Sequence, residues 1–111
     1  MNHPLNTLVL NNGKNPVKIN YLQTKKAALI LRALNHKLRY QILKLLDDQK
    51  RMPVTEIYVK LRIEQSVASQ HLAILRRAGI VITERTGKFI FYSPNYARIE
   101  EILKLVTDMV E

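Results

Sequence analysis

The chain has 111 residues with 47% hydrophobic content, which is enough for one compact domain, and it has no cysteine. Disulfides, thiolate metal sites and thiol redox chemistry are therefore excluded. No apolar run approaches the ~20 residues that span a bilayer, so we expect a soluble, cytoplasmic protein. Lys and Arg number 18 against 9 Asp and Glu, a net charge of +9, and this predicts a polyanionic partner, nucleic acid rather than a membrane surface.

Residues 1–20 are interpreted as an N-terminal arm or tail, and residues 21–111 as a single domain. Leu8, Val9 and Leu10 are followed by the turn-rich segment NNGKNP and then by VKIN. A short strand or an arm on the body fits this pattern, and a mobile tail fits it as well.

Two helices are predicted after this segment. Apolar and alanine residues dominate residues 21–34, which is typical of a helix. Asn35 is the expected cap of a second helix, because apolar residues recur at helical spacing from Leu38 to Leu46.

A helix-turn-helix follows. Pro53 suits the start of a short third helix over residues 54–62. A fourth helix lies within residues 64–80, and Gly79 is expected to adopt the left-handed conformation that ends it. Two short helices joined by a tight turn form a helix-turn-helix.

A hairpin and a last helix complete the pattern. The runs IVITER and KFIFYS are rich in β-branched and aromatic residues and are separated by Thr86-Gly87, which predicts two antiparallel strands. After Pro94-Asn95, residues 96–110 carry an apolar stripe at helical spacing. The expected fold class is mainly α with a β-hairpin wing, a winged helix-turn-helix that is dimeric.

The fourth helix carries two stripes at the same spacing. The apolar stripe includes His71, which we interpret as a packed or backbone-bonded side chain. The other stripe is polar, short and free of acidic residues, whereas a solvated face usually mixes Glu with Lys. A helix in the major groove needs short side chains that donate and accept at base edges, with arginine for guanine or phosphate. The candidate DNA-binding residues of this helix are Gln65, Ser66, Ser69, Gln70, Arg76 and Arg77.

The position of each residue along the helix suggests its role. Base-reading residues tend to lie in the N-terminal part, which favours Ser66, Ser69 and Gln70. Arg76 and Arg77, at the far end, are better placed for phosphates.

The hairpin adds two candidates, and one alternative function remains. Arg85 and Lys88 flank the tip of the hairpin, from which they would reach a phosphate or the minor groove. The alternative is a winged-helix protein-interaction module that docks an acidic partner. Docking surfaces favour exposed aromatic, Met or Leu side chains, and the polar face has Ser, Gln and Ala instead.

These residues resemble the ArsR-type family of bacterial winged-helix repressors. The resemblance runs from Ala33 to Tyr92, in ALNHKLRYQILKLL, VTEIYVKLRIEQSVASQHLAILRRAGIV and ERTGKFIFYS. It implies a homodimer held by the first and last helices, with two recognition helices in successive major grooves of a pseudo-palindromic operator. By the same resemblance Ser66, Ser69 and Gln70 match base-reading positions, His71 matches a motif histidine, and Arg85 and Lys88 match wing contacts. The residues expected at the dimer interface are Leu22, Ala28, Leu31, Ile99, Ile102, Leu103, Val106, Met109 and Val110.

One departure from that family concerns metals. Metal-sensing members place cysteines near the start of the helix before the recognition helix, or His and carboxylates on the last helix. Here residues 52–58 contain no cysteine and the last helix contains no histidine. His3 and His36 lack an evident partner set, so we expect no metal and no cofactor.

No catalytic arrangement can be assembled from the sequence. The three glycines, Gly13, Gly79 and Gly87, are interpreted as turns or caps rather than as a phosphate loop. We therefore expect no enzyme. A small-molecule effector is not indicated by any residue, although the N-terminal arm and the dimer helices would be its natural place.

Overall fold

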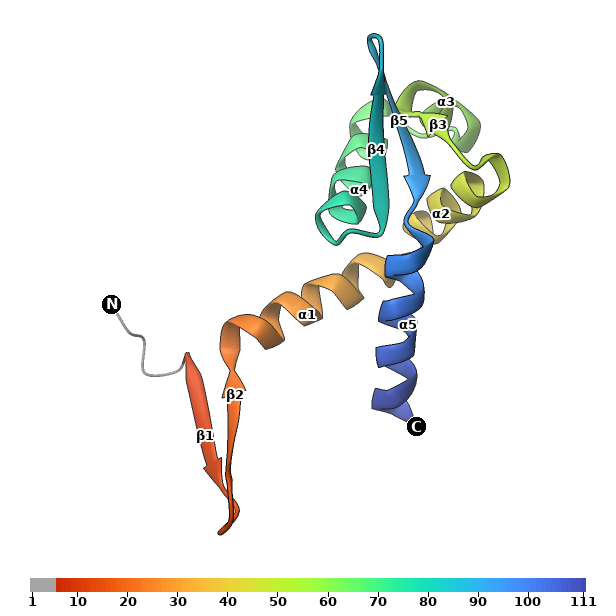
Figure 1. Ribbon diagram of the computed structural model, residues 1–111. Coiled ribbons are helices and arrows are strands. Elements are labelled where there is room, and N and C mark those ends of the chain that lie inside the picture. The colour runs from red at the N-terminus through yellow and green to blue at the C-terminus, as the bar shows by residue number, and fades with distance from the viewer. Residues whose placement is uncertain (1–5) are drawn as a thin grey trace. The chain divides into compact units, whose positions relative to one another are not determined.

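The structure is a computed structural model that describes residues 6–111 (Figure 1). It divides into two compact units, one up to Arg32 and the other from Ala33 to Glu111. The division falls inside the first helix, α1 (Tyr21–Leu34). No helix in the described part of the chain is long and apolar enough to cross a membrane.

The first unit is a β-hairpin followed by α1. Strands β1 (Thr7–Asn11) and β2 (Pro16–Asn20) are antiparallel, with Leu8 opposite Ile19 and Leu10 opposite Val17. Because successive side chains alternate between the faces of a strand, these four aliphatic residues lie on one face. Residues 7–20 therefore form a β-hairpin, while residues 1–5 of the predicted arm lie outside the described residues.

Asparagine side chains close both ends of this hairpin. Asn12 Oδ1 accepts hydrogen bonds from the backbone N–H groups of Lys14 and Asn15, each at 3.0 Å. Asn20 Oδ1 accepts from the N–H of Gln23 at 3.1 Å, in the first turn of α1. These bonds satisfy backbone donors that the turn and the helix start leave unpaired.

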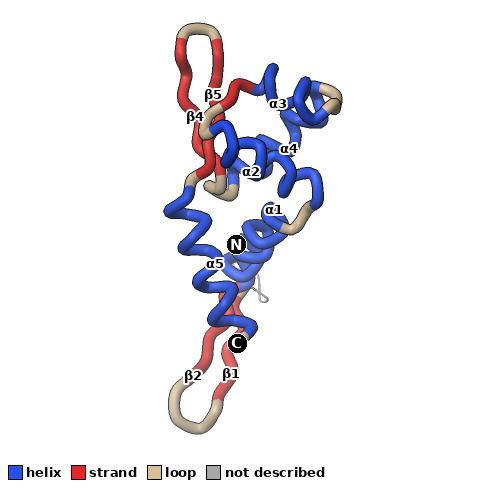
Figure 2. Tube along the Cα trace, turned by 90° about the vertical axis from the view of Figure 1, so that its right-hand side faces the viewer, coloured by secondary structure: helices blue, strands red, loops and turns tan. Residues whose placement is uncertain are grey.

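The second unit combines four further helices with a three-stranded sheet. The helices are α2 (Lys37–Gln49), α3 (Val54–Leu61), α4 (Gln65–Arg77) and α5 (Tyr96–Val110). The strands are β3 (Met52–Pro53), β4 (Val81–Thr86) and β5 (Phe89–Pro94), with β5 in the middle. In Figures 1 and 2 the β4–β5 hairpin extends beyond the helices. This architecture confirms the predicted helices and the β-hairpin wing.

The core forms where the apolar stripes of the helices meet. Ile42 and Leu46 of α2, Ile57 of α3, and Leu72 and Leu75 of α4 are fully buried. Burying such a side chain contributes roughly 1.5–3 kcal/mol. The stripe on α4 thus fixes which side of that helix faces inward, and the polar side is left to solvent.

The cap of α2 differs from the expectation. His36, not Asn35, is the capping residue, and its Nδ1 accepts a hydrogen bond from the N–H of Leu38 at 3.1 Å. An imidazole nitrogen that is not protonated can fill the acceptor role that Asn or Asp usually has at this position.

The sheet differs in two details. Thr86 pairs with Phe89, so the two-residue turn is formed by Gly87 and Lys88 rather than by Thr86 and Gly87. Strand β3 was not expected, and it adds Met52 and Pro53 to the free edge of β5.

Helix α4 ends as predicted at a left-handed glycine. Gly79 has a φ of 76°. Its N–H donates to the carbonyl of Arg76, and the N–H of Ile80 donates to the carbonyl of Leu75, both at 2.9 Å. This pair of bonds is a Schellman motif, which satisfies the last carbonyls of the helix and turns the chain into β4.

Candidate nucleic-acid interface

Helix α4 presents a polar, acid-free face to solvent. The predicted DNA-binding residues of the helix are all exposed: Gln65, Ser66, Ser69, Gln70, Arg76 and Arg77. Ala68, Leu72 and Leu75, on the other side, are fully buried. The helix is therefore anchored by its apolar side, and its short polar side chains are accessible to a groove of DNA.

The turn before α4 is tight because one residue adopts a left-handed conformation. Arg62 has a φ of 57°, and its N–H donates to the carbonyl of Val59 at 3.2 Å. The N–H of Ile63 donates to the carbonyl of Tyr58 at 3.1 Å. A left-handed residue other than glycine costs on the order of 1 kcal/mol, so the surrounding packing holds this turn in place.

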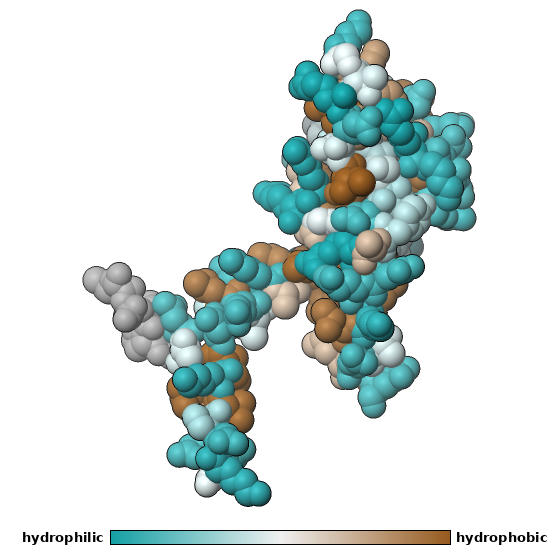
Figure 3. Space-filling model, viewed as in Figure 1, coloured by the Kyte–Doolittle hydropathy of each residue, from teal (hydrophilic) through white to brown (hydrophobic). Residues whose placement is uncertain are grey.

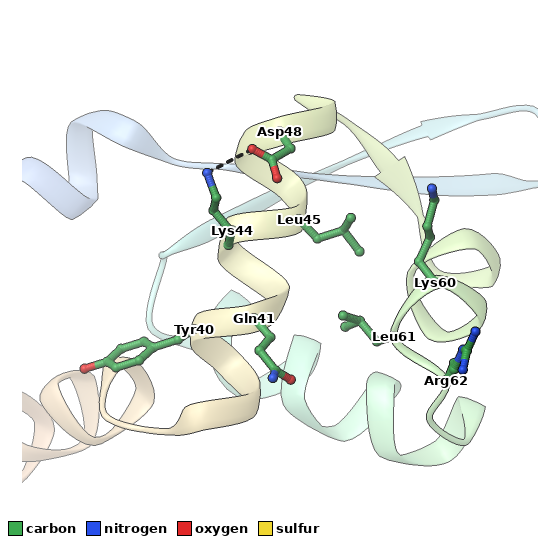
Figure 4. A pocket seen from close by; sticks show the side chains of 8 residues that line it. All are labelled: Tyr40, Gln41, Lys44, Leu45, Asp48, Lys60, Leu61 and Arg62. Carbon is green, nitrogen blue, oxygen red and sulfur yellow. Dashed lines mark ion pairs between the residues drawn. The ribbon is translucent and has the colours of Figure 1, made fainter.

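A shallow groove lies between α2 and α3 (Figure 4). Leu45 and Leu61 face one another across it, and Lys44 pairs with Asp48 at 3.1 Å on its rim. Lys60 and Arg62 line the α3 side. These two cations extend the positive charge of the helix-turn-helix to the segment that precedes α4.

The wing is held by Arg51, which the sequence did not single out. Its guanidinium lies 3.9 Å from the ring centroid of Phe91 and donates to Thr86 Oγ1 at 3.0 Å. It also forms an ion pair with Glu84 at 3.5 Å. Glu84 is the one acidic residue between positions 81 and 94, so this contact leaves a basic wing.

The predicted wing residues lie at the tip of the hairpin. Both are exposed: Arg85 is the next-to-last residue of β4, and Lys88 is the second residue of the turn. The ammonium group of Lys88 lies 5.6 Å from the ring centroid of Phe89. Both side chains are therefore accessible to a DNA backbone that passes the wing.

A shallow hollow joins α4 to the sheet. It is lined by Ser69, Ala73, Arg76, Arg77 and Tyr92 of β5. Hydroxyl groups and guanidinium groups together suit a phosphate oxygen. Sequence reasoning missed Tyr92, because only the fold brings this residue of β5 close to α4.

His71 lies on the inner side of α4 and is half-buried. Arg39, which is buried, donates from Nε to the carbonyl of Ala33 at 2.7 Å, and its NH1 lies 3.0 Å from His71 Nδ1. Arginine only donates, so His71 Nδ1 accepts and the imidazole is neutral. Burial lowers the pKa of His71, and the charges of His36 and Arg39 lower it further. The partner of His71 is thus a side chain rather than the backbone.

Asn95 connects the end of α4 to the start of α5. Its Nδ2 donates to the carbonyl of Gly79 at 3.0 Å, and its Oδ1 accepts from the N–H of Arg98 at 3.3 Å. Its own N–H donates to the carbonyl of Ile80 at 2.8 Å. One residue therefore fixes the start of α5 relative to the end of α4.

The predicted dimer residues fall into two groups. Ile102 is only 4% exposed, so its side chain belongs to the core and is not available to a partner. The others keep accessible surface: Leu22, Ala28, Leu31, Ile99, Leu103, Val106, Met109 and Val110. Helical spacing alone placed Ile102 with them, because it cannot distinguish the two sides of an apolar stripe.

The described residues contain no cluster of three or more His, Cys, Asp or Glu side chains that could hold a metal ion. The ring of His36 instead lies 4.7 Å from that of His71. His3 lies outside the described residues.

A helix-turn-helix whose second helix exposes an acid-free polar face, followed by a basic β-hairpin, defines a winged helix-turn-helix DNA-binding protein. The chain belongs to the arsR family of bacterial regulatory proteins, whose model matches residues 36–83. It is therefore a DNA-binding transcriptional regulator and not an enzyme.

Related proteins support this membership, because their sequence similarity to this chain covers most of its length. The chain is 40% identical over 85 residues to an uncharacterized HTH-type transcriptional regulator of Methanocaldococcus jannaschii, covering 77% of this chain and 96% of that protein. It is 35% identical over 89 residues to the transcriptional repressor PagR of Bacillus anthracis, covering 80% and 89%.

Solved structures show the same fold. The crystal structure of PagR superposes with a TM-score of 0.61 at 33% identity, covering 78% of this chain and 99% of that one. HlyU from Vibrio cholerae gives a TM-score of 0.61 at 32% identity, covering 81% and 97%. An ArsR-like regulator from Rhodococcus has a TM-score of 0.68 at 20% identity, covering 78% and 81%, and shows the fold alone.

Proposed function

We propose that the protein is a homodimeric repressor that binds a pseudo-palindromic operator. In this proposal residues 21–111 act as one domain, with α1 and α5 at the interface and one α4 in each of two successive major grooves. Exposed apolar side chains on α5 support the interface, since Met109 and Val110 are 74% and 77% exposed. The similarity to the repressor PagR supports repression. The proposed target is promoter DNA, so the proposed location is the cytoplasm.

The exposed, acid-free face of α4 beside a basic wing carries the proposal. Ser66, Ser69 and Gln70 would read base edges, with Gln65 at the start of the helix. Four cations would hold the phosphate backbone, namely Arg76, Arg77, Arg85 and Lys88. Phosphate contacts supply affinity and base contacts supply specificity.

The variant Gln70→Ala tests the base-reading role. Duplexes bound by the wild-type protein would be selected from a random library, and affinities would be measured for the selected and for a scrambled duplex. We expect the variant to lose roughly 1–3 kcal/mol on the selected duplex and little on the scrambled one. Gln41→Ala, an exposed glutamine on α2, is the matched control and should change neither affinity. Equal losses on both duplexes would remove Gln70 from base reading.

A promoter reporter tests the direction of regulation. HlyU of Vibrio cholerae, 36% identical over 81 residues with 73% of this chain and 74% of that protein covered, is named a transcriptional activator. We expect the present protein to lower transcription from a promoter that carries the selected duplex, because an occupied operator blocks polymerase. Raised transcription would overturn the assignment as a repressor and leave DNA binding intact.

A further inference from the structure

The β1–β2 hairpin has an apolar face that stays exposed in the described chain. Leu8, Leu10, Val17 and Ile19 form this face, and each is between 38% and 54% exposed. Figure 3 shows apolar side chains gathered on the hairpin. A two-stranded hairpin alone is marginally stable in water, so this face needs a surface to pack on.

The C-terminal half of α5 has a matching surface. It extends away from helices α2, α3 and α4 in Figures 1 and 2. Leu103, Leu105, Met109 and Val110 are each at least half exposed. Leu103 also lines a shallow hollow together with Glu100 and Asp108. The surface of α5 is therefore both apolar and acidic.

The two segments that carry these surfaces have opposite net charges. Residues 1–34 contain five basic side chains and no acidic one, namely Lys14, Lys18, Lys25, Lys26 and Arg32. Residues 95–111 are acidic overall, with Glu100, Glu101, Asp108 and Glu111 against Arg98 and Lys104. Lys14 and Lys18 belong to the hairpin itself, and Lys18, which is opposite Val9, lies on the face away from the apolar one. Opposite net charges on the two segments favour contact between one patch and the other over contact of either patch with its own kind.

We propose that the apolar face of the hairpin of one copy packs on the C-terminal half of α5 of a second copy. The exchange is reciprocal, so a two-fold axis closes the dimer and each copy contributes both surfaces. This inference rests on the dimer of the proposed function and adds the N-terminal hairpin to its interface.

The exposed apolar areas of the hairpin and of α5 together match the size of a stable dimer interface. A whole Leu side chain has on the order of 100 Å² of apolar surface, so the four partly exposed residues of each patch offer roughly 200–250 Å². Neither patch alone approaches the ~800 Å² per partner of a stable interface. Each copy contributes both patches, so their apolar areas add. If about 0.6 of the buried surface is apolar, the whole interface buries roughly 750 Å² of each copy.

Cysteine cross-linking tests the contact, because the wild-type chain has no cysteine. Leu10→Cys and Met109→Cys chains of different tag length would be purified, mixed, exchanged and oxidised. We expect the mixed disulfide between the two chains to be the main covalent dimer. Val9→Cys is the matched control, since Val9 is 53% exposed, close to the 48% of Leu10, but lies on the other face of the strand.

Three outcomes of the cross-linking would overturn the inference. The first is a dominant disulfide between two Leu10→Cys chains, and the second is an equal yield of mixed disulfide from the Val9→Cys and Leu10→Cys chains. The third concerns a double variant, Leu10→Cys with Met109→Cys in one chain: a disulfide that forms within that chain would overturn the contact between copies.

Sedimentation equilibrium separates this inference from the proposed dimer. We expect Leu10→Glu to raise the dimer dissociation constant at least about tenfold, and Val9→Glu to change it less than about twofold. A dimer that Leu10→Glu leaves unchanged would overturn the hairpin contact alone. A wild-type chain that is monomeric at micromolar concentration would overturn the proposed dimer itself.

Discussion

At the scale of single residues, His71 makes the stability of the second unit depend on pH. Its Nδ1 accepts from Arg39, and burial lowers its pKa below 6.5, helped by the charges of His36 and Arg39. The unfolded chain therefore binds this proton at higher pH than the folded chain does. The stabilisation is complete above about pH 6.5 and is lost as the pH falls through the lowered pKa.

Urea denaturation at pH 7.5 and 5.5 measures this effect. We expect a lower midpoint at pH 5.5 for the wild-type protein. In His71→Gln the amide oxygen can still accept from Arg39 but cannot be protonated, so the difference between the two midpoints should shrink. A difference of the same size in both proteins would show that other groups carry the pH dependence.

Gly79 is a second residue whose identity is required by its backbone conformation. Its φ of 76° is left-handed, but an added Cβ would lie 3.6 Å from Arg98 Cγ, an ordinary contact. The cost of Gly79→Ala should therefore come from the backbone and amount to about 1–2 kcal/mol in urea denaturation. Gly13→Ala, also left-handed but in the β1–β2 turn with open space around it, should leave the unfolding of the second unit unchanged. Equal effects would refute the assignment to the α4 cap.

At the scale of elements, periodicity predicted the helices and the wing because each stripe matches one buried side. Ile42 and Leu46 on α2, and Leu72 and Leu75 on α4, are fully buried at the predicted spacing. Strand β3 was missed because two residues carry no period, and proline is unusual inside a strand.

Contacts between distant segments were not readable in the sequence. Arg51 and Thr86 are separated by 35 positions, yet they share a hydrogen bond. Tyr92 lines the hollow on α4 only because the fold of the sheet brings this residue close to that helix. The candidate site could thus be predicted where it lies on one helix, whereas the residues that support it depend on tertiary structure.

Arg51 offers a test of how the wing works. Arg51→Ala removes the contacts with Phe91, Thr86 and Glu84, so we expect faster amide exchange in β4 and β5. The affinity for DNA should fall several-fold, while the salt dependence of binding keeps its slope, because this guanidinium is engaged with the protein.

Arg85→Ala is the comparison for that variant. Arg85 is exposed at the wing tip, and we expect its loss to lower the slope of log affinity against log salt by about one phosphate contact. If Arg51→Ala lowered this slope by the same amount, Arg51 would be a direct contact to the DNA backbone.

At the scale of the whole molecule, α5 would connect the proposed DNA-binding face of α4 to the proposed dimer. Asn95 fixes the start of α5 to the end of α4 through Gly79, while the far half of α5 carries exposed apolar side chains. A dimer built on α5 would therefore set the distance between two recognition helices rigidly. In such dimers the half-sites lie about one helical turn apart, roughly 34–36 Å.

That rigidity predicts the effect of half-site spacing on affinity. Inserting about 5 bp between the half-sites of the selected operator rotates the second half-site to the opposite side of the duplex, so only one α4 can bind. We expect the affinity to fall about 10²-fold or more, towards that of a duplex with one half-site. An insertion of about 10 bp returns the second half-site to the same side of the duplex but doubles the distance between the half-sites. It should therefore not restore the affinity. Replacing central base pairs without changing the length is the control, and binding that tolerates the 5-bp insertion would show that each copy reads DNA independently.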